Sequence, residues 1–307
     1  MRPKTPPEYV EAYINASVGK AYMPTNKLFL MGMMAGAFVA IGAASASAAS
    51  HALTNVGVAK ALAGIVFPIG LMMIIFIGGE LFTGDTMMLM GAMHGQFTYK
   101  RLIRTLAWVF LSNLNGAVLI SFLVVNSGQY AYSANGLGAY TIKVAVDKCN
   151  GNFISLVISG ILCNVLVCVA VLMSMAAKDA TGKVFGFLFP IFAFVIAGYE
   201  HCVANMYYIP AGMQAARNEV YVNKAIELYG LTTEQLGSLN LSNFLIGNLL
   251  PVTIGNVIGG MLFISVPLYI LHKDKLYKDP THKEYIRVER EHKETFEKEL
   301  HHPIEKQ

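Results

Sequence analysis

Four side chains that can carry a charge or exchange a proton lie inside long apolar segments of this 307-residue sequence. They are Glu80, Asp85, Glu200 and His201, and they fall in two stretches, residues 78–85 and 198–205, that both begin Gly-x-Glu. An ionisable group in an apolar membrane segment is costly unless it is paired or hydrated, so such residues indicate function by default. The chemistry they could perform is to attract, hold or protonate a small ion.

His201 is the strongest candidate for this chemistry. The unperturbed pKa of histidine is about 6.5, which makes it a proton donor or acceptor near neutrality, and we expect it in a pore. A structural role is the alternative for the acids. Glu80 and Glu200 would accept hydrogen bonds from backbone amides freed at a helix break, and Asp85 would cap the next helix. His51 is expected near a membrane interface.

Composition shows that these charges are exceptional. Charged residues make up 14% of the chain and hydrophobic residues 55%, whereas soluble proteins carry roughly 25% charged residues. Nine basic and nine acidic residues lie in 273–307 alone, so the remainder cannot cover a water-facing surface, which excludes a soluble enzyme and a disordered chain. The net charge of +4 without a basic run argues against nucleic acid. Four cysteines without CxxC spacing argue against a metal site, and we expect no cofactor.

Six segments reach the length of about 20 residues that a membrane helix needs. They span residues 28–54, 62–93, 103–125, 152–177, 185–212 and 244–271. Eighteen Lys and Arg flank one side of these spans and five flank the other, which predicts that both termini are cytoplasmic in the cell membrane. We expect a cytoplasmic N-terminal segment over 1–27, a six-helix transmembrane domain over 28–272 and a charged helical tail over 273–307.

The second and fifth spans are long and interrupted by the two Gly-x-Glu stretches. The third and sixth spans share an Asn-x-x-Gly step that begins at Asn113 and Asn256. These similarities predict an all-α protein of two three-helix repeats, which must be inverted because three is odd. Residues 127–151 are expected to form an outer loop and 213–243 a polar outer connection, with a short helix opening near Thr232.

Four motifs of this chain resemble the formate/nitrite transporter family. They are Ile77 to Gly84 (IGGELFTG), Gly160 to Ala170 (GILCNVLVCVA), Gly198 to Pro210 (GYEHCVANMYYIP) and Asn248 to Gly260 (NLLPVTIGNVIGG). The resemblance covers roughly residues 20–272. It implies an aquaporin-like protomer with broken second and fifth helices, assembled as a homopentamer with one pore per subunit.

The resemblance also implies roles for individual residues. It implies an inner slit of Leu71, Leu81 and Phe82, an outer slit of Phe67 and Phe194, a central His201 that faces Thr83 beside Glu200, and a vestibule lysine, Lys148, in the outer loop. It further implies helix-break and packing roles for Gly79, Glu80, Gly84, Asp85, Asn164, Gly198, Asn205 and Asn256. Gly84-Asp85 replaces the small hydroxyl residues of some formate channels, which leaves the substrate open.

Such a pore would carry small weak-acid anions across the lipid bilayer. Moving a bare ion into low dielectric costs of order 20 kcal/mol in the ideal case, whereas the conjugate acid avoids this cost. Lys148 would concentrate the anion, and a proton from water or relayed through His201 would neutralise it. Formate is the first expectation, passing as anion or as anion plus proton, and nitrite and hydrosulfide also fit.

Three other classes of protein are less compatible with the sequence. An aquaporin would show Asn-Pro-Ala boxes, and none occurs. A membrane enzyme would show His-Glu-x-x-His or Gly-x-Ser-x-Gly inside a span, and neither is present there. A structural scaffold would have no need of interrupted helices with central acids. We therefore expect a channel or transporter and not an enzyme.

Overall fold

The computed structural model describes residues 2–276, and within these residues all regular structure is helical. The predicted tail lies outside the described residues from position 277 onward. The elements are α1 (Pro6–Ala21), α2 (Thr25–Ser50), α3 (Val56–Val66), α4 (Ile69–Ile77), α5 (Phe82–Asp85), η1 (Thr86–Met88), α6 (Leu89–Met93), α7 (Tyr99–Asn126), η2 (Gln129–Ala131), α8 (Tyr132–Cys149), α9 (Phe153–Ala176), α10 (Ala180–Ala197), α11 (Cys202–Ala215), α12 (Glu219–Tyr229), α13 (Thr233–Gly237), η3 (Asn243–Leu249), α14 (Leu250–Ile258), η4 (Gly259–Ser265) and α15 (Val266–Leu276).

Six helical stretches in the described residues are long and apolar enough to cross a membrane, which confirms the predicted number. They are Thr25–Ser50, Val56–Ile77, Tyr99–Asn126, Phe153–Ala176, Ala180–Ala197 and Asn243–Leu276. Mean hydropathy over their best windows runs from 1.9 to 2.7. Much of this apolar surface faces outward, as expected where the surrounding solvent is lipid.

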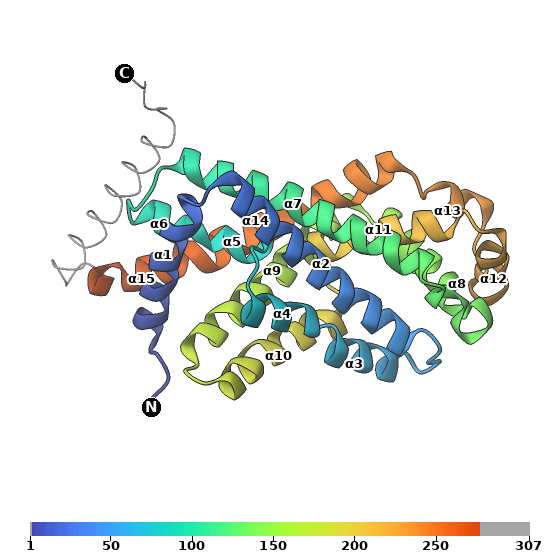
Figure 1. The fold of residues 1–307 in the computed structure, drawn as a ribbon, viewed down its shortest axis with the longest axis horizontal. Helices are drawn as coiled ribbons and strands as arrows, with labels where there is room; N and C mark the ends of the chain where they lie inside the picture. The colour runs from blue at the N-terminus through green and yellow to red at the C-terminus, as the bar shows by residue number, and fades with distance from the viewer. Residues whose placement is uncertain (1, 277–307) are drawn as a thin grey trace, which may run out of the picture.

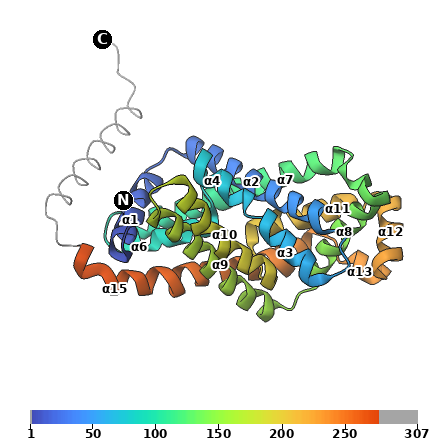
Figure 2. The same cartoon turned by 90° about the horizontal axis from the view of Figure 1, so that it is seen from below.

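The helices form an elongated bundle with a different set of helices at each end. Figures 1 and 2 show α1, α6 and α15 together at one end and α8, α12 and α13 at the other. Between them α2 packs on α7, α9 packs on α14 and α10, and α11 packs on α7 and α8. The short α5 contacts α7, α9 and α11, so residues near the start of α5 lie inside the bundle.

Two non-helical gaps, each four residues long, precede α5 and α11. Helix α4 ends at Ile77 and α5 begins at Phe82, while α10 ends at Ala197 and α11 begins at Cys202. The first residue of each gap is a glycine with positive φ, +104° at Gly78 and +73° at Gly198. A positive φ strains residues that have a Cβ atom, so glycine is favoured at these two positions. The Gly-x-Glu pattern therefore marks the points at which the chain leaves each helix.

The predicted outer loop over 127–151 is wrong for much of its length, because α8 (Tyr132–Cys149) is regularly helical from residue 136, after three residues with positive φ at 133–135. Its Gly, Asn, Ser and Tyr content suggested a loop. However, Leu137, Ile142 and Val146 are buried in one cluster, and helix packing outweighs weak helix propensity. In the following connection, Thr232 caps α13 with a capping box, so the predicted short helix is confirmed.

The N-terminal segment is part of the helical bundle. Helix α1 contacts α9, α15 and α6, and Val10, Tyr13 and Ile14 on it are at most 2% exposed. Thr5 and Glu8 form a capping box at its N-terminus, which satisfies backbone donors that a helix end leaves free. Helix α1 therefore carries its last turn, including Lys20, to the first gap.

Candidate functional site

Lys20 of α1 joins the two acids of the first gap region. Its Nζ lies 2.6 Å from Oε2 of Glu80 and 2.5 Å from Oδ1 of Asp85, and these carboxylates are 6% and 1% exposed. The structural role expected for Glu80 was to accept hydrogen bonds from freed amides, whereas its carboxylate is paired with Lys20. The cap role expected for Asp85 is wrong, because Leu81 precedes α5 and Asp85 is the last residue of α5. Buried carboxylates pair with a cation because an unpaired one is far more costly.

This first cluster contains one more carboxylate than ammonium groups. Oδ2 of Asp85 is buried and has no hydrogen-bond partner among the described residues. Burial lowers the pKa of Lys20, but Asp85 and Glu80 raise it by more, so the net pKa lies well above the usual lysine value. Lys20 therefore stays charged. Tyr13 of α1 donates a hydrogen bond of 2.8 Å to the Gly84 carbonyl beside this cluster.

Lys148 of α8 joins the acid of the second gap. Its Nζ donates to both carboxylate oxygens of Glu200 at 2.9 Å, and Asn205 Nδ2 donates to Oε2 of Glu200 at 2.6 Å. Glu200 is therefore satisfied by side chains, which corrects its proposed role as acceptor of freed amides. This second cluster contains one ammonium group and one carboxylate, so the lysine that the resemblance places in the vestibule, Lys148, is paired with Glu200.

Asn113 and Asn256 hold the two gaps with the same set of hydrogen bonds. Asn113 accepts from the Phe82 amide (2.9 Å) and donates to the carbonyls of Gly32 (2.8 Å) and Glu80 (2.9 Å). Asn256 accepts from the Cys202 amide (2.9 Å) and donates to the carbonyls of Gly160 (2.8 Å) and Glu200 (3.0 Å). Each amide thereby satisfies backbone groups that the interrupted helices leave free.

Asn164 of α9 joins residues near the first gap to Asn256, which holds the second gap. Its Nδ2 lies 2.6 Å from the Asn256 carbonyl, 3.1 Å from Thr86 Oγ1 and 3.2 Å from the Thr83 carbonyl. Asn164 is fully buried. Asn164 therefore lies at the junction between α5 and the sixth helical stretch, where it joins their backbones by hydrogen bonds.

His201 and Thr83 meet at the centre of the bundle. Nε2 of His201 lies 3.0 Å from Thr83 Oγ1, and the Ala204 backbone amide donates to Nδ1 at 3.1 Å. Because a backbone amide can only donate, Nδ1 is the acceptor and a neutral ring carries its proton on Nε2. His201 therefore caps α11 and directs an N–H group at Thr83, whose hydroxyl hydrogen is free to donate elsewhere.

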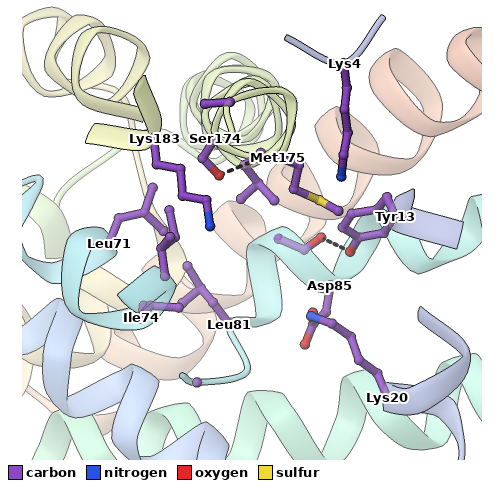
Figure 3. A pocket seen from close by; sticks show the side chains of 15 residues that line it. Lys4, Tyr13, Lys20, Leu71, Ile74, Leu81, Asp85, Ser174, Met175 and Lys183 are labelled. Atoms are coloured by element: carbon purple, nitrogen blue, oxygen red, sulfur yellow. Dashed lines mark hydrogen bonds and ion pairs between the residues drawn. The ribbon is translucent and has the colours of Figure 1, made fainter. Parts of the chain in front are cut away.

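A cavity of about 390 Å³ opens beside the first cluster, and we term it the α1-side cavity. Figure 3 shows Lys4, Lys20 and Lys183 around it, with Asp85 and Tyr13 on one wall and Leu71, Ile74 and Leu81 on another. Two of the three predicted inner-slit residues, Leu71 and Leu81, thus line it. The third, Phe82, packs edge to face on Phe110 of α7 with ring centroids 5.0 Å apart.

A second cavity of about 380 Å³, the α8-side cavity, lies on the other side of His201. Phe67 and Phe194 line it and pack edge to face, with centroids 5.6 Å apart. The Phe194 ring also stacks on His201 at 6.0 Å. Lys60, Lys143, Lys148, His51, Gly198 and Asn205 are further lining residues. The pair of Thr83 and His201 therefore lies between two cavities whose inner ends are apolar.

Three residues of this arrangement were absent from the predicted site: Lys20, Tyr13 and Asn113. Lys20 was counted only as a flanking charge, and Tyr13 had no distinguishing pattern. Asn113 carried a usable signal, because it occupies the same Asn-x-x-Gly step as Asn256. Within residues 2–276 no group of three His, Cys, Asp or Glu side chains could hold a metal ion.

Comparison with known proteins identifies the family. Residues 7–270 match the family model described as formate/nitrite transporter. The formate channel FocA of Haemophilus influenzae is 35% identical over 265 residues, covering 85% of this chain and 92% of that protein. A probable formate transporter of Methanothermobacter thermautotrophicus is 34% identical, covering 85% and 94% of the two chains.

Solved structures agree with this match. A pentameric formate channel with formate bound superposes with a TM-score of 0.71 at 29% identity, covering 81% of this chain and 97% of that one. An FNT family ion channel superposes with a TM-score of 0.71 at 26% identity, covering 86% and 98%. With six apolar helical stretches, this protein is a multi-pass membrane protein, and the chain belongs to the formate/nitrite transporter family.

Proposed function

We propose that this protein is a membrane channel for formate and similar small weak-acid anions. The observation that carries the proposal is the pair of His201 and Thr83 between two cavities with apolar inner ends. Relatives described as formate channels support the choice of formate. Family membership places the chain among transporters, and we propose no catalytic activity.

Passage is governed by the cost of removing the charge from water. Leu71 and Leu81 at one slit and Phe67 and Phe194 at the other offer no polar partner to a bare anion, whose ideal transfer cost into low dielectric is of order 20 kcal/mol. The conjugate acid avoids most of it. Formate therefore crosses as anion plus proton, and the proton is picked up as the dielectric falls and the pKa of the anion rises.

His201 acts in this path as a neutral hydrogen-bond donor. The Ala204 amide occupies Nδ1, so a second proton on that nitrogen would break the cap of α11. A shuttle through the ring would need this bond to open. We therefore assign His201 to orient Thr83 and the passing anion through Nε2–H, and we assign the neutralising proton to water at the slits.

We further propose that two inverted three-helix repeats build the path, with α4 and α5, and α10 and α11, as the broken helices. The matched hydrogen bonds of Asn113 and Asn256 support this. So do the glycines that follow them: a Cβ on Gly116 would meet the Met33 carbonyl, and one on Gly259 would meet that of Ile161.

Lys20 and Lys148 also support the proposed repeats, because they occupy matching positions. Lys20 is the penultimate residue of α1 and Lys148 the penultimate residue of α8, and each lysine reaches the glutamate of the gap in its own half. Because a three-helix repeat is odd, these two ends would face opposite sides of the bilayer. The Lys and Arg count assigns the α1 end to the cytoplasm, so we propose cytoplasmic termini in the plasma membrane.

We propose a homopentamer, because a similar solved channel is described as pentameric. Exposed apolar residues on α7, among them Ile103, Leu111 and Phe122, leave a face for lipid or a neighbouring subunit. We also propose the division into a cytoplasmic segment over 1–27, a channel domain over 28–272 and a charged tail over 273–307.

The test is uptake of formate, nitrite and hydrosulfide into proteoliposomes, with and without an imposed pH gradient. We expect formate flux that rises when the anion side is acidic. Replacing His201 by Asn keeps an N-cap acceptor, so the protein should fold. The shorter side chain should lose the contact with Thr83, and formate flux should fall about tenfold, the effect of one lost hydrogen bond. Lack of formate flux in the unmodified protein would overturn the proposal, and faster nitrite or hydrosulfide flux would move the substrate to that anion.

A further inference from the structure

Two lysines of the α1-side cavity form no ion pair within residues 2–276. Lys4 and Lys183 line this cavity together with Lys20, but only Lys20 has carboxylate partners there. Figure 3 shows their side chains directed into the cavity from two different walls. A small anion that enters therefore meets two ammonium groups that are not neutralised by a described side chain.

Both lysines are attached to fixed backbone. The Lys4 amide donates to the Ala176 carbonyl at 2.9 Å, which anchors the chain ahead of α1 to the end of α9. Lys183 lies in the first turns of α10, and its amide bonds to the Asp179 carbonyl at 3.1 Å. Two segments distant in sequence thus bring their ammonium groups to one entrance, where their fields add.

The third lysine of the cavity is already occupied. Lys20 is paired with Glu80 and Asp85, and Asp85 itself lines the cavity. A small anion is therefore attracted to Lys4 and Lys183 and not to Lys20. The cavity of about 390 Å³ is large enough for a small hydrated carboxylate, so the charge pattern places such an anion between Lys4 and Lys183.

We propose that Lys4 and Lys183 form an anion-binding site that collects small monovalent carboxylates at the α1-side entrance of the channel. The site lies ahead of Leu71 and Leu81 and raises the local anion concentration before dehydration begins. This inference rests on the proposed function, since it uses the transported anion as the ligand. It differs from the expectation for Lys148, which is bound by Glu200.

The test measures formate flux in proteoliposomes of the full-length protein in one orientation, selected through an N-terminal tag. Formate is supplied in turn to the α1 face and to the α8 face. Two ammonium groups near 4 Å interact with an anion by about 1 kcal/mol each in water. We therefore expect KM at the α1 face to rise about fivefold in K4Q or K183Q and about thirtyfold in the double variant. The maximal rate and the KM at the α8 face should not change.

Matched variants separate this site from general surface charge. K27Q removes an exposed lysine at the start of α2, outside the cavity lining, and should leave KM within about twofold, while K183R keeps the charge and should keep KM. High salt should remove the difference between the unmodified and double-variant proteins. Equal KM changes at both faces, or in K27Q, would overturn the inference. Absence of formate flux in the unmodified protein would instead overturn the proposed function.

Discussion

The two helix gaps share their backbone contacts but differ at the residue before the next helix and at the fourth residue of that helix. At the first gap Leu81 precedes α5, and at the second His201 precedes α11. The fourth residue of α5 is Asp85, whereas the fourth residue of α11 is Asn205. The first gap therefore has an apolar cap residue and a surplus carboxylate, and the second has a hydrogen-bonding cap residue and balanced charge.

This comparison shows which residues hold the backbone at both gaps and which residues differ in their chemistry. The asparagines that hold each gap, Asn113 and Asn256, make the same three kinds of hydrogen bond. The positions at the cap and in the first turn are not constrained by those bonds and are free to carry different chemistry. Two gaps held in the same way can thus carry an apolar side chain, Leu81, before one helix and an imidazole ring, His201, before the other.

The largest expected effect concerns the lysines that neutralise the gaps. K20Q leaves Glu80 and Asp85 buried without a cation and should destabilise the protein by about 3–5 kcal/mol, the usual cost of breaking a buried pair. K148Q should cost less, because Glu200 keeps its bond from Asn205. Thermal unfolding of the detergent-solubilised protein measures both. Restored stability in K20Q/D85N would support the surplus-carboxylate explanation, and equal losses in K20Q and K148Q would contradict it.

The asparagines test whether the two frames are equivalent. N113A and N256A each remove one acceptor and leave two backbone carbonyls without their donor, so each should destabilise by about 2–3 kcal/mol. Thermal unfolding under the same conditions would measure the difference between them. A loss in one variant that exceeds the other by more than about 1 kcal/mol would show that the gaps are not equivalent in energy.

An exchange of the fourth helix residues tests the charge difference directly. D85N keeps an oxygen that can accept from Lys20 and removes the surplus charge, so it should stabilise the protein by about 1–2 kcal/mol. N205D replaces a donor to Glu200 by a second carboxylate and should destabilise by a similar amount. Opposite signs in thermal unfolding are the expected result, and a destabilising D85N would refute the interpretation of the first cluster.

The smallest effect concerns the entrance of the α8-side cavity. Lys60 lines this cavity with its ammonium close to Gly198 and makes no ion pair within residues 2–276. K60Q should raise KM for formate at the α8 face about threefold and leave the maximal rate unchanged. K224Q, which removes a lysine of α12 that is paired with Glu227, is the matched control. Equal effects of K60Q and K224Q would show that only overall charge matters.

Much of the fold could be predicted from the sequence because membrane helices have a strong length and hydropathy signal. The six spans and the glycines that end α4 and α10 were found this way. Helix α8 was missed, since its small and polar residues form a helix only through contacts with α11 and α12. The pairing of Lys20 with Glu80 was equally inaccessible, because no local pattern relates a lysine ahead of the first span to an acid within the second.

The sequence by itself determined that this protein crosses a membrane six times and places Glu80, Asp85, Glu200 and His201 within the apolar spans, since hydropathy and residue spacing are local properties. Only the tertiary structure decided which charges are neutralised and which ring nitrogen of His201 carries the proton. Those properties depend on contacts between distant helices: α1 and α8 bring the lysines to the gaps, and the Ala204 amide sets the tautomer of His201.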